Sequence, residues 1–392
     1  MQNTGVIARG IVTPIFRQGD DLIGTICDCI KDSSETAGYK IAEGDIIAVT
    51  EAVVGRVQGN YASLEQVSKE VRTKMGGNDI GIVFPILSRN RFENVLKGIA
   101  RGCEKLYIQL SYPNDEVGNK IIDIATCDEK GVNPHSDNFT EAEFRAIFGM
   151  DTVHSFTGVD YIKHYKELAG NAEIVFSNDP KYILNYTKNI INCDIHTRKR
   201  TQTLIKKAGA DICLRLDELM NESVDGSGYS EYGLLGSNKA TDESVKLFPR
   251  DTNQFVNELQ TEITRRFGAK PEVMVYGDGC FKDPVGGIWE LADPVVSPAY
   301  TSGLSGTGNE LKIKYIADND YADLSGETLT NTVRDRIKSK AADLVGNMVS
   351  EGTTPRRIHD LVGSLCDLVS GSGDRGTPVV LIQNYFKNYA SS

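Results

Sequence analysis

Short apolar runs alternate with amphipathic segments along most of the chain, a pattern typical of strands alternating with helices. In the first half, the predicted strands are 45–49, 80–86, 105–112 and 173–177. The predicted helices there are 63–75 and 92–102. Ser63 is the expected N-cap of the first of these helices, because its hydroxyl can accept a hydrogen bond from a free backbone N–H of the first turn. The stretch 113–160 is rich in turn formers and acids and is expected to be a long excursion.

The second half continues this alternation and adds two long loops. A helix is expected to start at Asn178-Asp179-Pro180, followed by a helical segment at 204–208 and a strand at 210–214. The expected loops are 221–240 and 277–308. The remaining expected elements are helices 252–267, 328–346 and 354–370 and strands 272–276, 311–317 and 377–383. We therefore predict an α+β (mixed α/β) fold of two intertwined or adjacent α/β domains, 1–224 and 225–392.

The composition argues against nucleic-acid-binding and membrane-spanning proteins. The 392 residues include 43 Lys and Arg and 54 Asp and Glu, so the net charge is −11, and the pI is near 5.1. General nucleic-acid binding is not expected, because phosphate contacts need an excess of basic residues. The apolar runs are too short to span a membrane, and no signal peptide is visible. The eight cysteines are scattered, which is typical of reduced thiols and favours a cytoplasmic protein.

The loop 277–298 is the main acidic feature. It follows a predicted strand and carries Asp278, Asp283, Glu290 and Asp293 among glycines, prolines and the single Trp. Carboxylates on such a loop suit Mg²⁺ or Mn²⁺, which prefer oxygen ligands. Acidic loop residues are more commonly solvated turn formers. Apolar residues between these acids indicate a packed loop, and buried carboxylates need partners, so the pattern favours a metal site.

Basic residues gather in separate places. The segment 193–200 holds His196, Arg198 and Arg200, and Arg91 lies in a basic segment after the strand 80–86. Such clusters after strands or at helix starts are candidate anion sites. A solvated charged surface explains each cluster equally well.

A third polar group stands at the end of the strand 45–49. Glu51 and Arg56 there can form an internal ion pair or contact a ligand, and the sequence is compatible with both roles. The G-x-G-x-x-G spacing at 371–376 follows a helix and precedes a strand, the reverse of the dinucleotide-binding order. No P-loop and no G-x-S-x-G nucleophile motif occurs. Acidic loops that suit a metal ion, together with separate basic loops that suit an anion, indicate metal-assisted phosphate chemistry.

Four segments in order resemble a known family. They read TEAVVGRVQG at 50–59, YGLLGSN at 232–238, LFPRD at 247–251 and VMVYGDGCFKDP at 273–284. They are similar to the patterns S-Q-K-I-V-S-K-x-E-G, A-G-x-D-x-S-N, L-L-P-x-D and an apolar strand ending in D-T-F-G-R-P. The closing strand is also similar. The order and spacing resemble the coenzyme F-420:L-glutamate ligase (gamma-glutamyl ligase) family over about residues 5–60 and 225–392, so about 61–224 is expected to be an insertion.

The resemblance implies an α+β homodimer that uses GTP or ATP with Mg²⁺ or Mn²⁺. It implies that a carboxylated small-molecule acceptor is activated as an acyl phosphate and then attacked by the amine of glutamate. Asp278 is the implied metal ligand. Ser237 and Asn238 are implied to line the nucleotide site, with Lys239 and Gly279 as further cofactor-binding candidates. Arg56 takes the place of a phosphate-facing Lys, and His196, Arg198 and Arg200 join it as candidates for holding phosphates or the acceptor carboxylate.

Departures from the family pattern leave alternatives open. The family's metal-binding Asp corresponds to Leu235, which cannot bind a metal, and its Gln corresponds to Glu51. Glu51, Asp283 or Glu290 would then supply the missing carboxylate. Asp283 also stands near the family's Arg and reverses the local charge. These changes indicate a diverged member with another acceptor. The alternatives are a binding protein without catalysis and a metal-dependent phosphatase or nucleotidyl transferase.

Overall fold

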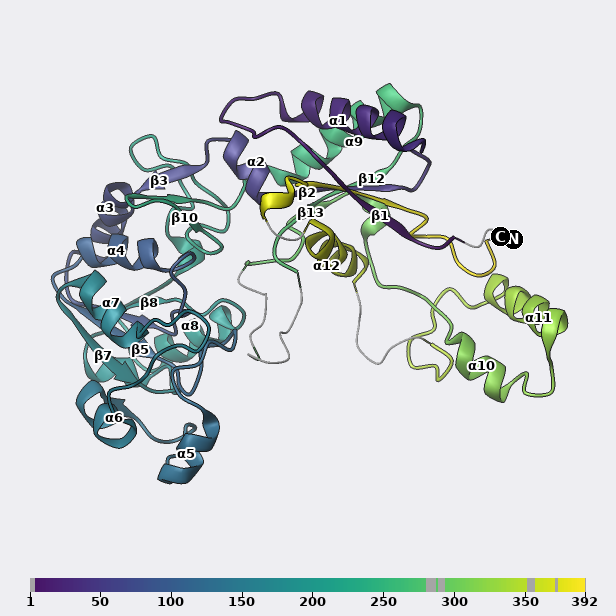
Figure 1. The fold of residues 1–392 in the computed structure, drawn as a ribbon. Helices are drawn as coiled ribbons and strands as arrows, with labels where there is room; N and C mark the ends of the chain where they lie inside the picture. Colours follow the sequence, from purple (N-terminus) through teal and green to yellow (C-terminus); the bar gives the residue numbers. More distant parts are fainter. Residues whose placement is uncertain (1–3, 280–286, 288–292, 351–356, 371–372, 392) are drawn as a thin grey trace.

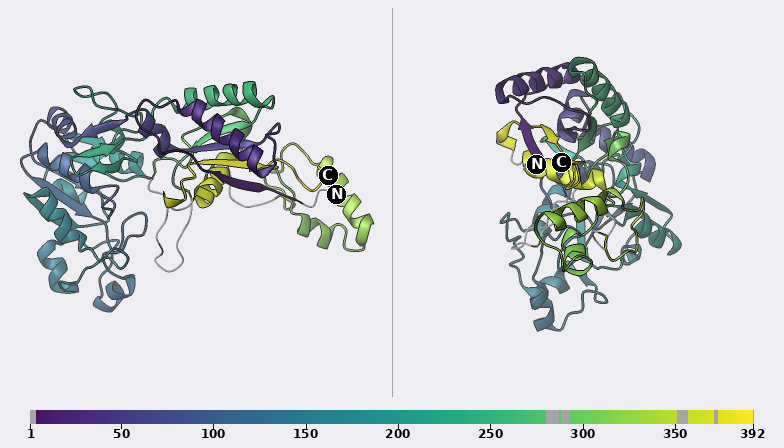
Figure 2. Two further views of the ribbon diagram at one scale, coloured as in Figure 1. Left: turned by 45° about the horizontal axis from the view of Figure 1, so that its top comes forward. Right: turned by 90° about the vertical axis from the view of Figure 1, so that its right-hand side faces the viewer.

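The computed structural model describes residues 4–279, 287, 293–350, 357–370 and 373–391, and its ribbon has two sheet-containing parts and a small helical pair (Figure 1). The first part is built on a five-stranded sheet in the order β1-β14-β2-β12-β13. Its strands are β1 (Ile7–Ile11), β14 (Val379–Gln383), β2 (Ile46–Thr50), β12 (Glu272–Tyr276) and β13 (Ala299–Tyr300). Only β2 and β12 pair in parallel. The pairing of β1 with β14 keeps the chain ends close, as both views of Figure 2 show.

Helices cover both faces of this sheet. Helices α1 (Leu22–Ala37) and α9 (Thr252–Phe267) pack on one face, against Ile47 and Val49 of β2. Helix α12 (Ile358–Ser370) packs on the other face, against Ile46 and Ala48. Successive side chains of a strand point to opposite faces, so covering both faces requires the continuous apolar run of β2.

The second part contains a six-stranded sheet in the order β6-β7-β5-β4-β8-β9. Its strands are β6 (Phe139–Thr140), β7 (Ala172–Phe176), β5 (Leu106–Leu110), β4 (Ile80–Val83), β8 (Asn189–Asn192) and β9 (Ile212–Arg215). All neighbours are parallel except the edge pair β6 and β7. The chain runs from the central β4 outward through β5 to β7, then crosses to β8 and β9. This is a doubly wound sheet whose strand order reverses between β4 and β8.

Helices also surround the second sheet. On one face, the main core joins Ile82 of β4 to α3 (Leu64–Met75), α4 (Glu93–Arg101) and α7 (Tyr161–Ala169). On the other face, a smaller cluster joins Val83 to α8 (Arg198–Lys207). Two further helices lie between β5 and β7 in the chain, α5 (Ile124–Lys130) and α6 (Glu141–Phe148).

The two parts are joined by α2 (Glu51–Val57) and by a small antiparallel sheet. This sheet contains β10 (Asn238–Thr241), β11 (Ser244–Lys246) and β3 (Tyr61–Ser63). The helical pair, α10 (Ile313–Asn319) and α11 (Gly326–Lys338), lies away from both large sheets (Figure 1). No helix in the described part of the chain is long and apolar enough to cross a membrane.

The mixed α/β architecture confirms the predicted fold class, and several predicted elements match closely. Helix α9 and strand β12 have the predicted bounds, and Ser63 forms a capping box with Gln66 at α3. The five-stranded sheet takes β1 and β2 from before residue 224 and β12, β13 and β14 from after it, so both predicted domains, 1–224 and 225–392, contribute strands to it.

Three element predictions were wrong. The predicted strand 311–317 is the start of helix α10, since a short apolar run fits either structure. The expected helix after Pro180 is only a 3-10 turn, Tyr182–Asn185. The helix predicted to reach residue 346 ends at Lys338. There the side-chain amide of Asn309 donates to the carbonyls of Ala341 and Ala342, which gives these carbonyls partners outside a helix.

Candidate active site

A cavity of about 380 Å³ lies between the two sheet-containing parts. Its walls come from the start of α2, the loop between β4 and α4, the β10–β11 hairpin, the end of β12 and the end of α12. The lining residues are Thr50, Glu51, Ala52, Asn90, Arg91, Asn238, Lys246, Tyr276, Gly277, Asp278, Asp367 and Ser370.

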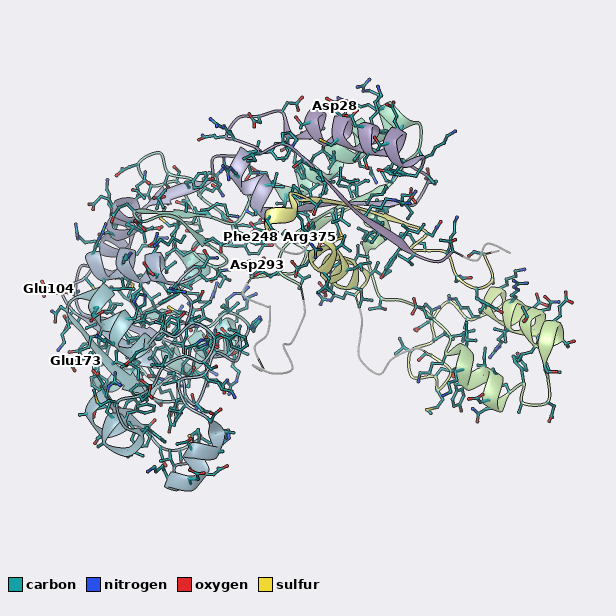
Figure 3. All side chains as sticks on the ribbon, viewed as in Figure 1. Asp28, Glu104, Glu173, Phe248, Asp293 and Arg375 are labelled. Atoms are coloured by element: carbon teal, nitrogen blue, oxygen red, sulfur yellow. The ribbon has the colours of Figure 1, made fainter. Side chains whose placement is uncertain are left out.

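Arg91 forms the charged centre of this cavity. Its guanidinium makes ion pairs with Asp278 and Asp293, and its side chain is only 13% exposed. Asp293 lies where the two parts of the chain face each other (Figure 3). Its carboxylate also accepts a hydrogen bond from the backbone N–H of Asp278, at 2.6 Å. Burial disfavours the charged guanidinium, but the carboxylates of Asp293 and Asp278 outweigh it and raise the pKa of Arg91. Arg91 therefore stays cationic.

Two further charged groups complete the lining. Lys246 Nζ lies 3.1 and 3.2 Å from the two carboxylate oxygens of Glu51, whose side chain is buried, and the Lys246 side chain is 12% exposed. Burial raises the pKa of Glu51, against the opposing charge of Lys246. Asp367, on α12, accepts a hydrogen bond from the N–H of Gly279 at 2.9 Å, and burial raises its pKa too. The cavity thus combines two cations with carboxylates that burial makes more basic.

Glycine is required where β12 runs into the acidic loop. A Cβ atom at Gly277 would lie 2.2 Å from a carboxylate oxygen of Asp293, so only glycine leaves that carboxylate in place. The loop 232–238 has a similar requirement at Gly233, where φ is +55° and a Cβ would lie 2.2 Å from the carbonyl of Leu219. Both glycines stand in the segments that carried the family resemblance.

The structure brings part of the predicted site together. Glu51, Asn238 and Asp278 line the cavity, and the N–H of Gly279 binds Asp367 at its wall. The hydroxyl of Ser237, next to Asn238, is buried and has no hydrogen-bond partner among the described residues.

Other predicted site residues lie elsewhere. Lys239 is 3.2 Å from Glu93 and 2.9 Å from Asp242 and does not line the cavity. Arg56 is exposed on α2. Asp283 and Glu290 lie outside the described residues.

The basic segment 193–200 belongs to the six-stranded sheet, after β8. His196 Nδ1 lies 2.9 Å from Glu116, and Arg198 Nε lies 3.5 Å from Asp217. Arg200 lines a second cavity at that sheet. His196, Arg198 and Arg200 therefore do not line the cavity that contains Asp278, although the sequence grouped them with it.

Sequence reasoning missed two charged residues of the cavity. Lys246 stands alone in an ordinary hairpin, and Asp367 is a single acid near the end of an amphipathic helix. Lys246 directly precedes the LFPRD segment at 247–251, but the resemblance attached no site residue to that segment. Arg91 and Asp293 were noted within charge clusters, but their pairing joins positions 202 residues apart.

The described residues contain no group of three or more His, Cys, Asp or Glu side chains arranged to hold a metal ion. Carboxylate oxygens do face the cavity, from Asp278 and Asp367, and such donors suit Mg²⁺ or Mn²⁺. Leu235, at the family's Asp position, is buried in the apolar core of the six-stranded sheet. The described residues therefore offer single carboxylates of a suitable type and no complete metal site, and Leu235 offers no ligand.

Comparison with known proteins decides the family. The chain matches the family described as F420-0:Gamma-glutamyl ligase over residues 10–384. It belongs to this family. The match covers nearly the whole chain, including the segment for which the motifs gave no counterpart. No match was found among curated proteins. Membership in the gamma-glutamyl ligase family makes this chain a ligase with the family's mixed α+β fold.

Proposed function

We propose that this member of the gamma-glutamyl ligase family joins the amino group of glutamate, through an amide bond, to the carboxylate of a carboxylated cofactor, using GTP or ATP. The observation that carries the proposal is the cavity where Arg91 and Lys246 stand among Asp278, Asp367 and Glu51. Family membership supplies the reaction class, and this charge arrangement suits phosphoryl transfer, where positioning and charge stabilisation dominate.

The proposed reaction has two steps. An oxygen of the acceptor carboxylate attacks the terminal phosphorus, the bond to the bridging oxygen breaks, and the nucleoside diphosphate leaves. The amino nitrogen of glutamate then attacks the acyl carbon, the acyl C–O bond breaks, and phosphate leaves while the amine gives up a proton. Arg91 and Lys246 would stabilise the phosphate oxygens. Glu51 would accept the proton, because its raised pKa makes it a stronger base.

Asp278 and Asp367 are the described residues that would hold Mg²⁺ or Mn²⁺, with Asp283 or Glu290 as further candidates from the adjacent loop. The ion would supply charge stabilisation at the phosphate oxygens. Asn238 lines the cavity and Ser237 stands next to it, with an unpartnered buried hydroxyl among the described residues. These two residues support a nucleotide position at this wall.

The test is phosphate release by the full chain with nucleotide, divalent ion, acceptor and glutamate. We expect release to require all four, and Asp278→Asn to lower it by about 10²-fold, a typical loss for a group that stabilises transition-state charge. Asp32→Asn, an exposed change on α1, is the matched control. Unchanged turnover in Asp278→Asn contradicts the proposal. Release without glutamate indicates a phosphatase, and nucleotide binding without turnover indicates a binding protein.

We also propose a homodimer, as the resemblance to the family implies. The chain mass is 42.9 kDa, so light scattering should give twice this value. A single-chain mass at assay concentration would contradict a stable dimer.

A further inference from the structure

A second and larger cavity, of about 770 Å³, lies in the six-stranded sheet part. It shares no lining residue with the candidate active site. Its volume is in the range of small-molecule sites, roughly 300–1,000 Å³. The ligase reaction proposed above leaves this cavity without a role.

The cavity opens at the carboxyl ends of the parallel strands. Phe84 follows β4, Tyr112 follows β5, Asn178 follows β7 and Asp194 follows β8, and all four line it. Doubly wound sheets bind ligands at this edge, where the strand order reverses, and here that point is between β4 and β8. Phe84 also has a φ of +57°, an unfavourable value for a non-glycine residue, and residues with such backbone strain cluster at functional sites.

The apolar part of the lining suits a flat ring. Phe84, Val132 and Ile124 all face the cavity, and Ile124 is 55% exposed although it is a large apolar residue. Burying this apolar surface against a heterocyclic ring is favourable.

Positions that would normally receive a phosphate are already filled. A helix N-terminus attracts phosphate through its free N–H groups. At the start of α8, Asp194 accepts from the N–H of Thr197 at 2.9 Å. Just before α8, Glu116 accepts from the N–H groups of Ile195 and His196, at 2.5 and 3.1 Å. These carboxylates occupy the donors. The four acidic side chains of the lining, Asp115, Glu116, Asp128 and Asp194, also outnumber its single arginine, Arg200, and so oppose binding of an added anion.

The cavity does offer a hydrogen-bond acceptor to the hydroxyl groups of a ligand. Asp128 lines the cavity, and its exposed carboxylate has no hydrogen bond or ion pair within the described ranges. In dinucleotide-binding sheets a carboxylate holds the ribose hydroxyls. We propose that this cavity binds a nucleoside, with the base against Phe84 and Ile124 and the ribose hydroxyls at Asp128, in preference to a nucleoside phosphate.

The cavity is connected to the candidate active site by one short loop. The loop between β4 and α4 begins at Phe84, in the nucleoside cavity, and reaches Asn90 and Arg91, in the ligase cavity. A bound nucleoside would therefore contact the loop that positions Arg91.

The test is calorimetric titration of the full chain with adenosine and guanosine, and with their 5′-monophosphates, without metal. We expect saturable binding of at least one nucleoside, and about tenfold weaker binding of its monophosphate. Ile124→Trp, which fills the cavity, should weaken nucleoside binding about tenfold. Ile313→Trp, the same substitution at another exposed isoleucine, on α10, should leave it unchanged. Asp128→Ala, a change in an exposed side chain, should weaken it without filling the cavity.

Lys246→Met separates the two cavities, because it alters only the ligase cavity. Unchanged nucleoside binding in this variant supports the proposal. Absence of saturable binding, equal binding of the monophosphate, or loss of binding in Lys246→Met but not in Ile124→Trp would each overturn it. Binding is measured without turnover, so failure of this proposal and failure of the ligase proposal are distinguishable.

Discussion

Arg91 makes a charged contact between the two sheet-containing parts at the cavity. It pairs with Asp278 and Asp293, which come 187 and 202 residues later in the chain. The side chain of Asp293 is 1% exposed, so its charge has little water to compensate it if the guanidinium is removed. Removing one partner of a buried ion pair costs more than the pair itself contributes.

Arg91→Met should therefore lower the free energy of unfolding by about 3 kcal/mol, measured by urea denaturation of the full chain. Arg89→Met changes an exposed arginine of the same loop and should stay within about 0.5 kcal/mol of the wild type. Equal effects of the two substitutions would show that the ion pairs of Arg91 contribute no more than an exposed charge.

Glu51 gives a prediction for pH dependence. Burial raises its pKa, so its carboxyl stays protonated to a higher pH than an exposed glutamate. A protonated carboxyl cannot accept the proton of the amine, so kcat should fall as pH drops through this raised pKa. Glu51→Gln should lose that acidic limb and about 10²-fold in kcat, the usual contribution of a general base.

The matched control for Glu51 is Glu65→Gln, an exposed change on α3, which should keep both the rate and the pH profile. If Glu51→Gln lowers the rate but keeps the acidic limb, the group that titrates in this limb is another residue.

At the scale of elements, the contact between α3 and α4 depends on a missing side chain. Gly98 of α4 faces Val67 of α3, and a Cβ atom at Gly98 would lie 2.6 Å from a methyl carbon of Val67. The glycine is unfavourable for the helix itself by about 1 kcal/mol. Close approach of the two helices explains why a glycine occupies this position.

Gly98→Ala should consequently destabilise the protein by about 1–3 kcal/mol, as overpacking does, although alanine is the better helix former. The double variant Gly98→Ala with Val67→Ala should be less destabilised than the sum of the two single variants, because the second change makes room for the first. Urea denaturation of the four proteins measures this coupling. Additive effects would show that the cost of Gly98→Ala does not arise from contact with Val67.

Local elements were more predictable from the sequence than their arrangement. The bounds of α9 and β12 follow from apolar periodicity and from glycines, which act over a few residues. The 311–317 segment was misread because its apolar positions suit both periods, and α10 is fixed by packing with α11. The sheet neighbours β1, β14 and β2 come from opposite ends of the chain, and no local pattern encodes that pairing.

The candidate site shows the same limit. Asp278 was recognisable because a family motif carries it, whereas Lys246 and Asp367 reach the cavity only through the fold. The basic segment 193–200 has suitable chemistry but lies at another sheet. Charge clusters in a sequence therefore identify candidate groups, and the topology decides which of them meet.

At the scale of the whole molecule, burial is unevenly distributed. Strands β2, β12 and β14 are covered on both faces. Helices α10 and α11 have a small separate core and lie at the opposite end of the molecule from the six-stranded sheet, as the left view of Figure 2 shows. The buried residues of this small core are Leu311, Ile316, Val333, Ile337, Leu344 and Val349. A unit with so few buried apolar side chains should open at a lower free energy than the global transition.

Hydrogen exchange measured by mass spectrometry should show this difference. Amides of α10 and α11 should exchange well before those of β2 and β12. Ile337→Val should cost about 1 kcal/mol in the small core, which corresponds to roughly fivefold faster exchange there, with β2 unchanged. Ile47→Val makes the same chemical change in the five-stranded sheet and should leave exchange of α10 and α11 unaffected. Equal protection of both regions, or an effect of Ile47→Val on α11, would show instead that the helical pair unfolds together with the sheets.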